Sequence, residues 1–200
     1  MAAAVLAAGV VIAATPAGAV PFRPCTIKGT AGNDVIHGTP RSDVICADQG
    51  GDDVIYGRGG GDWIFSGPGD DRILTGGGNG EFIFSNGGDD RIHLSDGDTL
   101  YVDAGPGDDL VFGGGGHDHV SGNRGNDVIF GGPGNDQISG GNGRDRLYGG
   151  SGSEVCLYDR GDGFVDHVFG GPGNDDANAS DRDVVRSASQ SSCSPPAPPP

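Results

Sequence analysis

The most constraining feature of this sequence is a nine-residue motif that repeats along most of its length. Residues 122–150 read GNRGNDVIFGGPGNDQISGGNGRDRLYGG, so three nearly identical units follow one another. Each unit opens with glycine, has Asp at its sixth place and has Ile or Leu two places later. A disordered glycine-rich chain does not keep a strict period, so the motif indicates a repeat fold.

The residues between the glycines predict very short β-strands. An apolar residue stands two places after almost every acid, at steps of nine and sometimes ten residues. This eighth-place series includes Ile36, Ile45, Ile55, Ile64, Ile73, Ile83, Ile92, Val111, Val120, Ile129, Ile138 and Leu147. Apolar, mostly β-branched triplets bounded by glycine favour strands, and the glycines favour turns. No stretch between glycine clusters is long enough for a stable helix.

One strand and one turn cannot bury their own isoleucine, whereas stacked units can. With turns on alternate sides, two units make one coil of about eighteen residues, and neighbouring coils lie roughly 4.8 Å apart as parallel strands. The sequence therefore predicts an all-β fold, a β-solenoid of stacked nonapeptide repeats.

In such a solenoid, the acids at the sixth place lie above one another. Two unit charges about 5 Å apart repel by roughly 3 kcal/mol at an effective dielectric of 20, unless a cation lies between them. Carboxylates and turn carbonyls offer only oxygen ligands, and a flexible shell of many oxygens suits Ca²⁺ better than Mg²⁺. We therefore expect multiple calcium ions along the turns.

The predicted metal ligands are the aspartates at the sixth place. They are Asp34, Asp43, Asp53, Asp62, Asp71, Asp90, Asp109, Asp118, Asp127, Asp136, Asp145 and Asp175.

Alternate units place the sixth residue on two opposite edges of the solenoid. The first edge carries Asp34, Asp53, Asp71, Asp90, Asp109, Asp127, Asp145 and Asp166. The second edge carries Asp43, Asp62, Glu81, Thr99, Asp118, Asp136, Glu154 and Asp175. Every residue other than Asp falls on the second edge. We hypothesise a continuous calcium ladder on the first edge and one interrupted near Glu81 and Thr99 on the second.

The units GGPGNDQIS and GGNGRDRLY resemble the nonapeptide of the repeats-in-toxin (RTX), or hemolysin-type, calcium-binding family. The resemblance covers roughly residues 29–178. It implies a right-handed parallel β-roll that holds Ca²⁺ between adjacent turns and is disordered without the metal. Because the family also occurs beside protease, lipase and toxin domains, a calcium-dependent accessory module or remnant of a secreted hydrolase or toxin is the alternative function.

The chain is strongly acidic, with 28 acidic and 12 basic residues and a formal net charge of −16. Nucleic acids and anionic membranes require a basic face, so the charge argues against both as partners. Calcium ions are the predicted partners, and a cell-surface, polysaccharide or protein partner stays open.

Residues 1–19 are typical of a secretory signal peptide, because an apolar stretch precedes the small residues Ala17, Gly18 and Ala19. The apolar run is too short for a membrane anchor, so we expect a secreted, extracellular protein without a membrane span. An N-terminal cap is expected at 20–28 and the calcium-binding β-roll at 29–178. A C-terminal cap with a flexible Ser/Pro-rich tail is expected at 179–200.

Four cysteines fit an oxidising compartment and permit three pairings. We favour Cys25–Cys46 and Cys156–Cys193, each at one end of the repeats. A free, buried Cys156 is the alternative to the second pair.

No catalytic motif emerges from the sequence, which lacks HExxH, G-x-S-x-G and P-loop patterns. His117 and His119 would point to opposite faces of a strand, which favours surface histidines over a zinc site. We therefore predict a non-enzymatic protein with a structural, adhesive or interaction role. Among the aromatic residues, those at the ninth place are expected inside the roll, and Trp63 and Phe82 are the candidates for outward contact.

Overall fold

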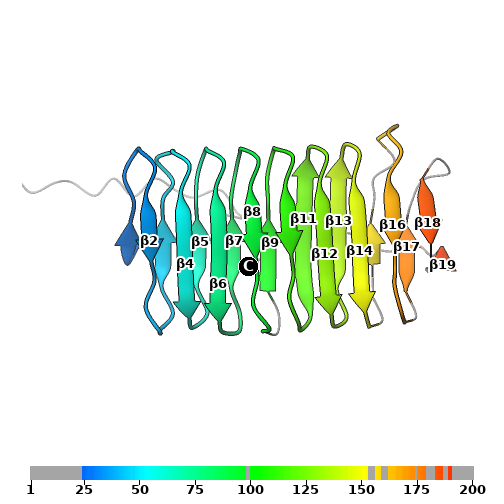
Figure 1. The fold of residues 1–200 in the computed structure, drawn as a ribbon, viewed down its shortest axis with the longest axis horizontal. Coiled ribbons are helices and arrows are strands. Elements are labelled where there is room, and N and C mark those ends of the chain that lie inside the picture. Colours follow the sequence, from blue (N-terminus) through cyan, green and yellow to red (C-terminus); the bar gives the residue numbers. More distant parts are fainter. Residues whose placement is uncertain are drawn as a thin grey trace, which may run out of the picture.

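The computed structural model describes residues 24–97, 100–152, 156–158, 162–173, 175–178, 183–186 and 189–190. All regular elements in these residues are β-strands, and each strand pairs in parallel with strands of the neighbouring coils. The strands form a long, regular stack (Figure 1). The predicted all-β parallel solenoid is thereby confirmed.

Two sheets make up the solenoid, and each strand pairs with the strand two further along the chain. The odd sheet contains β1 (Ile27–Lys28), β3 (Val44–Cys46), β5 (Trp63–Phe65), β7 (Phe82–Phe84), β9 (Leu100–Asp103), β11 (Asp118–Arg124), β13 (Gln137–Asn142), β15 (Cys156–Tyr158), β17 (Asp176–Asn178) and β19 (Ser189–Gln190). The even sheet contains β2 (Val35–His37), β4 (Val54–Gly59), β6 (Arg72–Gly77), β8 (Arg91–His93), β10 (Leu110–Phe112), β12 (Val128–Pro133), β14 (Arg146–Ser151), β16 (His167–Phe169) and β18 (Val184–Arg186).

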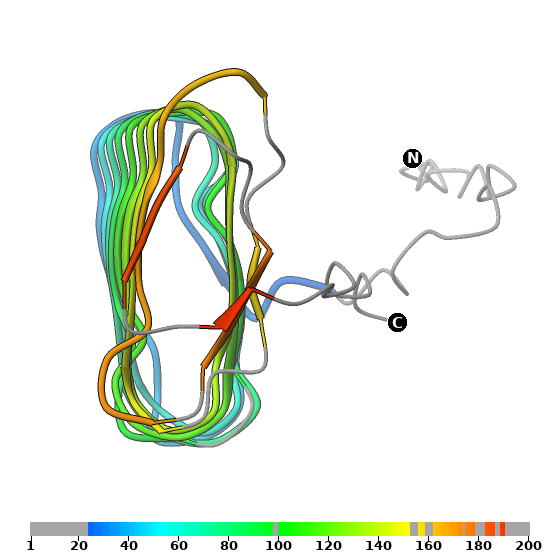
Figure 2. The same ribbon diagram turned by 90° about the vertical axis from the view of Figure 1, so that its right-hand side faces the viewer.

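Seen end-on, the coils form a flattened oval whose two long sides are the sheets (Figure 2). The space between the sheets holds the eighth-place residues, and Ile55, Ile64 and Ile129 are 0% exposed. These residues form one continuous apolar cluster that runs from Ile36 to Ala177. Each isoleucine is thus buried by the coils on either side of it, as the repeat pattern predicts.

Register follows the repeat, because residues 18 or 19 apart lie side by side. Ile36 pairs with Ile55, and Ile55 pairs with Ile73. Longer steps occur where Leu147 pairs with Val168 and Leu157 pairs with Ala177, and a shorter step follows from Val168 to Val185. The extra residues lie in the segment before β16, where Phe164 and Val165 are exposed.

The disulfide Cys25–Cys46 is present and joins the chain before β1 to the end of β3. The predicted partner of Cys156, Cys193, lies outside the described residues. The same holds for the expected signal segment 1–19 and for residues 191–200 of the expected tail. No helix in the described part of the chain has the length and apolar character needed to cross a membrane.

The prediction for the ninth-place aromatic residues is wrong. Successive strand residues point to opposite faces, and the eighth-place residue occupies the core, so the seventh and ninth places both face outward. Phe112, at a ninth place, is 37% exposed. Trp63, at a seventh place, lies on the outer face of the odd sheet but is only 8% exposed, because Phe65, Phe82 and Phe84 pack around it.

Candidate metal sites at the turns

The sixth-place residues line the two edges where the chain turns from one sheet to the other. Those of the first edge directly precede even-numbered strands, and those of the second edge precede or begin odd-numbered strands. The coil geometry therefore brings the predicted ligands together in two rows. Thr99 and Glu154, both on the second edge, lie outside the described residues.

On the first edge, one hydrogen bond repeats from coil to coil. The backbone N–H of each sixth-place aspartate donates to Oδ1 of the aspartate in the next coil, over N–O distances of 2.6–3.1 Å. This inner ladder is unbroken from Asp34 to Asp183. It orients every carboxylate in the same way, with Oδ1 satisfied by the preceding coil.

The second carboxylate oxygen, Oδ2, has no such partner. On the first edge it is buried without a hydrogen bond in Asp53, Asp71, Asp90, Asp109, Asp127, Asp145 and Asp166. The same is true of Asp62 and Asp136 on the second edge. A buried carboxylate without a compensating partner is strongly unfavourable, so a row of them indicates a positive ligand.

The surroundings of these oxygens show what kind of ligand fits. A Cβ atom placed on Gly131 would lie 2.5 Å from Oδ2 of Asp136 and 2.6 Å from the carbonyl oxygen of Gly149. A Cβ atom on Gly57 would likewise lie 2.7 Å from Oδ2 of Asp62 and 2.6 Å from the Thr75 carbonyl oxygen. Glycine therefore keeps open a small space into which a carboxylate and a carbonyl oxygen both point.

Burial raises the pKa of the Asp90, Asp109 and Asp127 carboxyl groups, and neighbouring carboxylates raise it further. The pKa of Asp90 is raised to about 7, that of Asp109 to about 8 and that of Asp127 to about 7. On the second edge, burial and then the charge of Asp43 raise the pKa of Asp62 to about 6. The highest value belongs to Asp109, which has a charged neighbour in the coil on each side.

The first coil differs from the others. Oδ2 of Asp34 accepts a hydrogen bond from the Thr30 N–H at 2.6 Å, and Oδ2 of Asp43 accepts one from the Thr39 N–H at 2.7 Å. The Thr30 hydroxyl also donates to Asp34 Oδ2, and the Thr39 hydroxyl also donates to Asp43 Oδ2. These turns satisfy their carboxylates with protein groups, so the unpartnered oxygens begin at Asp53 and Asp62.

The second edge has an inner ladder only in parts. The Asp43 N–H donates to Asp62 Oδ1 at 2.9 Å, and the Asp118 N–H donates to Asp136 Oδ1 at 3.0 Å. Between them, both carboxylate oxygens of Glu81 are buried without a hydrogen-bond partner. The longer side chain breaks the repeated bond at the position that the sequence pattern singled out.

An outer ladder runs along the first edge at the fifth place of each unit. Here the backbone N–H of a later coil donates to the side chain of an earlier one, as from Asp70 to Asp52, Asp89 to Asp70 and Asp108 to Asp89. The N–O distances are 2.8–3.1 Å, and these carboxylates are exposed. The inner and outer ladders therefore join the same coils in opposite directions.

Within the described residues, no group of three or more His, Cys, Asp or Glu side chains lies close enough together to hold a metal ion by side chains alone. A site built here must therefore draw most of its ligands from backbone carbonyls, with one or two carboxylates. All of these ligands are oxygens, and an all-oxygen set that combines carboxylate and carbonyl groups fits Ca²⁺.

Two aspartates of these rows were absent from the predicted ligands. Asp166 belongs to the predicted first edge, and its Oδ2 is buried without a hydrogen-bond partner like that of its neighbours. Asp183 accepts the last bond of the inner ladder. The nine-residue spacing did not predict Asp183, because the longer step before Asp166 interrupts the period in this part of the sequence.

A parallel β-solenoid whose glycine turns present rows of buried carboxylates defines a class of calcium-binding repeat protein. The family model "RTX calcium-binding nonapeptide repeat (4 copies)" matches residues 26–50, 48–82, 101–129, 121–153, 130–165 and 160–181. The chain belongs to this family, whose repeats are typical of secreted proteins. Among curated proteins, none matches the chain.

Proposed function

We propose that this chain is a secreted, non-enzymatic protein that folds when its turns bind Ca²⁺. The observation that carries the proposal is the row of buried, unpartnered Oδ2 atoms on the first edge, from Asp53 to Asp166. Family membership supports calcium as the ion. The residues proposed to hold it are the sixth-place aspartates from Asp53 and Asp62 onward, together with carbonyl oxygens of the adjoining glycine turns.

In this mechanism, bound Ca²⁺ neutralises the carboxylates and so removes the repulsion between coils. The residues of the chain prepare the sites. The inner ladder fixes each carboxylate through Oδ1 and leaves Oδ2 directed at the space beside a turn glycine. Because each aspartate is fixed by the N–H of a neighbouring coil, the sites form only when the coils stack, which couples folding to binding.

Several sites are sufficient to decide whether the chain folds. Each site at ten times its dissociation constant contributes roughly 1.4 kcal/mol, and a whole domain is stable by only about 5–15 kcal/mol. The low calcium level of a cell interior would therefore leave the chain unfolded, and a calcium-rich exterior would fold it.

The proposed secretion is supported by residues 1–19 and by the Cys25–Cys46 disulfide, which fits an oxidising compartment. N-terminal sequencing of the protein from the medium of an expressing culture tests this. A mature chain that begins at Val20 would agree with the proposal, and a chain retained in the cell with Met1 intact would contradict it.

The test of calcium-dependent folding is far-UV circular dichroism of the purified chain, titrated with Ca²⁺ after chelation and with Mg²⁺ in parallel. A cooperative gain of β signal with Ca²⁺ and none with Mg²⁺ at the same concentration is expected. A chain already folded in chelator at neutral pH would refute the coupling of metal and fold.

The two edges should differ in calcium content. The first edge has an unbroken inner ladder, whereas Glu81 interrupts the second. We expect continuous calcium on the first edge and a gap on the second in a calcium-bound crystal structure. Equal occupancy along both edges would contradict this part of the proposal.

A further inference from the structure

The outer surface of the even sheet has an unusual composition for so acidic a chain. Its outward side chains are the seventh- and ninth-place residues of the even-numbered strands. These are Val35, His37, Val54, Tyr56, Arg72, Leu74, Arg91, His93, Leu110, Phe112, Val128, Phe130, Arg146, Tyr148, His167, Phe169, Val184 and Arg186. None of them is acidic, although the chain has 28 acidic residues. The outer surface of the odd sheet, in contrast, includes Asp103 and Asp176.

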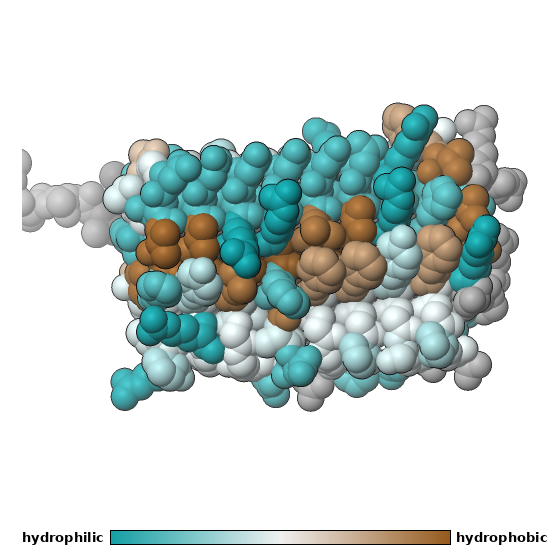
Figure 3. Space-filling model, in the orientation of Figure 1, coloured by the Kyte–Doolittle hydropathy of each residue, from teal (hydrophilic) through white to brown (hydrophobic). Residues whose placement is uncertain are grey.

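The charged side chains at the outward positions of this even-sheet surface are basic. Arg72, Arg91 and Arg146 occupy seventh places and are exposed, and the exposed imidazole of His93 lies on the same strand as Arg91. Figure 3 shows this side of the molecule as an apolar band crossed by hydrophilic side chains, with a separate hydrophilic band above it along the first edge. Although the chain has a net charge of −16, the outward positions of this sheet carry only basic and neutral side chains.

The aromatic rings on this surface also favour negative groups. Phe112, Phe130, Tyr148 and Phe169 stack in sequence, with ring centroids 4.6–5.1 Å apart and planes within 4–9° of parallel. Each ring covers the face of its neighbour, so the ring edges point outward. Ring edges carry partial positive charge and ring faces partial negative charge. The stack therefore attracts anions and offers few free faces to a neutral sugar.

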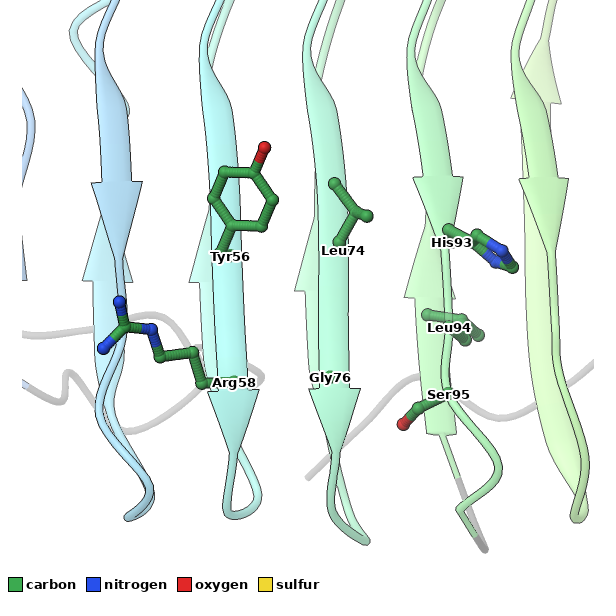
Figure 4. A pocket seen from close by; sticks show the side chains of 7 residues that line it. All are labelled: Tyr56, Arg58, Leu74, Gly76, His93, Leu94 and Ser95. Carbon is green, nitrogen blue, oxygen red and sulfur yellow. The ribbon is translucent and has the colours of Figure 1, made fainter.

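The row of rings is interrupted at Leu74. Tyr56 and His93 stand on either side of it on β4 and β8, and Arg58 and Ser95 lie at the rim (Figure 4). The resulting hollow has a volume of about 340 Å³ and is lined mostly by apolar atoms. Its size suits one ring of a ligand. Arg58 lines the hollow, and Arg72 and Arg91 occupy the preceding outward positions of the strands that carry Leu74 and His93.

We propose that the outer surface of the even sheet binds an acidic polysaccharide that runs along the solenoid. Charge complementarity selects a polyanion, because every charged side chain at these outward positions is basic. Arginine forks bind carboxylate and sulfate groups, and the outward arginines on β6, β8, β14 and β18 distribute positive charge along the length of the sheet, which suits a linear polyanion. One sugar ring would occupy the hollow at Leu74. The proposal goes beyond calcium binding and depends on it only because the surface exists in the folded chain.

The test is binding of dextran sulfate by the calcium-bound chain, with neutral dextran as the matched control polymer. The variant pair R72Q/R91Q is compared with R41Q/R124Q, which removes the same charge from exposed arginines outside the even sheet. An exposed ion pair contributes up to about a fivefold factor, so R72Q/R91Q should bind about tenfold more weakly while R41Q/R124Q stays within about twofold of the unsubstituted chain. The variant Leu74→Phe, which fills the hollow without changing charge, should also weaken binding.

Four outcomes would overturn the proposal. These are absence of binding, equal affinity for dextran, equal weakening by the two arginine pairs, and binding of poly-glutamate as tight as that of dextran sulfate. The last would identify an acidic peptide as the partner instead. Circular dichroism of the same samples in Ca²⁺ establishes that each variant is folded, so a failure of calcium-dependent folding is distinguished from a failure of polysaccharide binding.

Discussion

Protons should substitute for calcium in stabilising the first edge. Burial, followed by the charges of Asp127 and Asp90, raises the pKa of the Asp109 carboxyl from 3.8 to about 8. The folded chain therefore holds this proton more tightly than the unfolded chain. Between about pH 4 and pH 8 folding takes up protons, so the stability of the metal-free chain falls as pH rises and recovers as pH falls.

The expected change in the free energy of unfolding with pH is large compared with the stability of a domain. At about 1.4 kcal/mol per pH unit, the shift at Asp109 alone corresponds to roughly 5 kcal/mol lost at pH 8. A whole domain is stable by about 5–15 kcal/mol, and the pKa of Asp90 and that of Asp127 are raised too. The metal-free chain should therefore be unfolded near pH 8 and regain β-structure in mild acid.

The assay is far-UV circular dichroism of the metal-free chain at fixed ionic strength, from about pH 8.5 to about pH 5.5. The apparent dissociation constant for Ca²⁺, measured by calorimetry on the folded chain, should rise as the pH falls, because protons compete for the same carboxylates. Asp109→Asn keeps the Oδ1 acceptor and removes the charge, so it should stabilise the metal-free chain at pH 8 and weaken its response to calcium. The matched control is Asp108→Asn at the exposed neighbouring residue. A β signal independent of pH, or equal behaviour of the two variants, would refute the reasoning.

Three further predictions concern single side chains. Gly131→Ala places a Cβ atom 2.5 Å from Oδ2 of Asp136 and should raise the calcium midpoint in a dichroism titration, whereas Gly77→Ala, with no atom within 4 Å, should leave it unchanged. Ile129→Ala, at a fully buried position, should lower the free energy of unfolding in Ca²⁺ by about 2–5 kcal/mol, measured by denaturant titration. Glu81→Asp should restore the missing hydrogen bond of the second edge and raise stability in Ca²⁺ by about 1 kcal/mol; an unchanged or lower melting temperature would contradict this.

The repeat pattern predicted the parts of the fold that depend on periodicity. The core position of Ile55 and Ile64, the coil length and the two rows of aspartates all follow from one residue recurring at a fixed interval. The interruption at Glu81 was also visible, because a longer acid cannot place its oxygens where Asp does.

Features that depend on single contacts were not predicted. Asp34 and Asp53 occupy the same place in the repeat, yet Oδ2 of Asp34 is satisfied by Thr30 and Oδ2 of Asp53 has no hydrogen-bond partner. The ninth-place rings were expected inside, although the alternation of a strand places Phe112 and Phe130 on the outer face once the eighth residue is buried. The period gives a residue's position in the coil but not the hydrogen bonds it makes there.

Because all hydrogen bonds of the inner ladder run in the same direction, the stack of coils has a polarity along the chain. On the first edge, the backbone N–H of the sixth-place aspartate donates to a carboxylate of the following coil. The Asp127 N–H donates to Asp145 Oδ1, and the Asp145 N–H donates to Asp166 Oδ1. A chain that emerges N-terminus first from a narrow channel therefore completes each coil only when the following coil has emerged. Assembly trails synthesis or transport by one coil, and the coils already formed serve as the template onto which the next one adds.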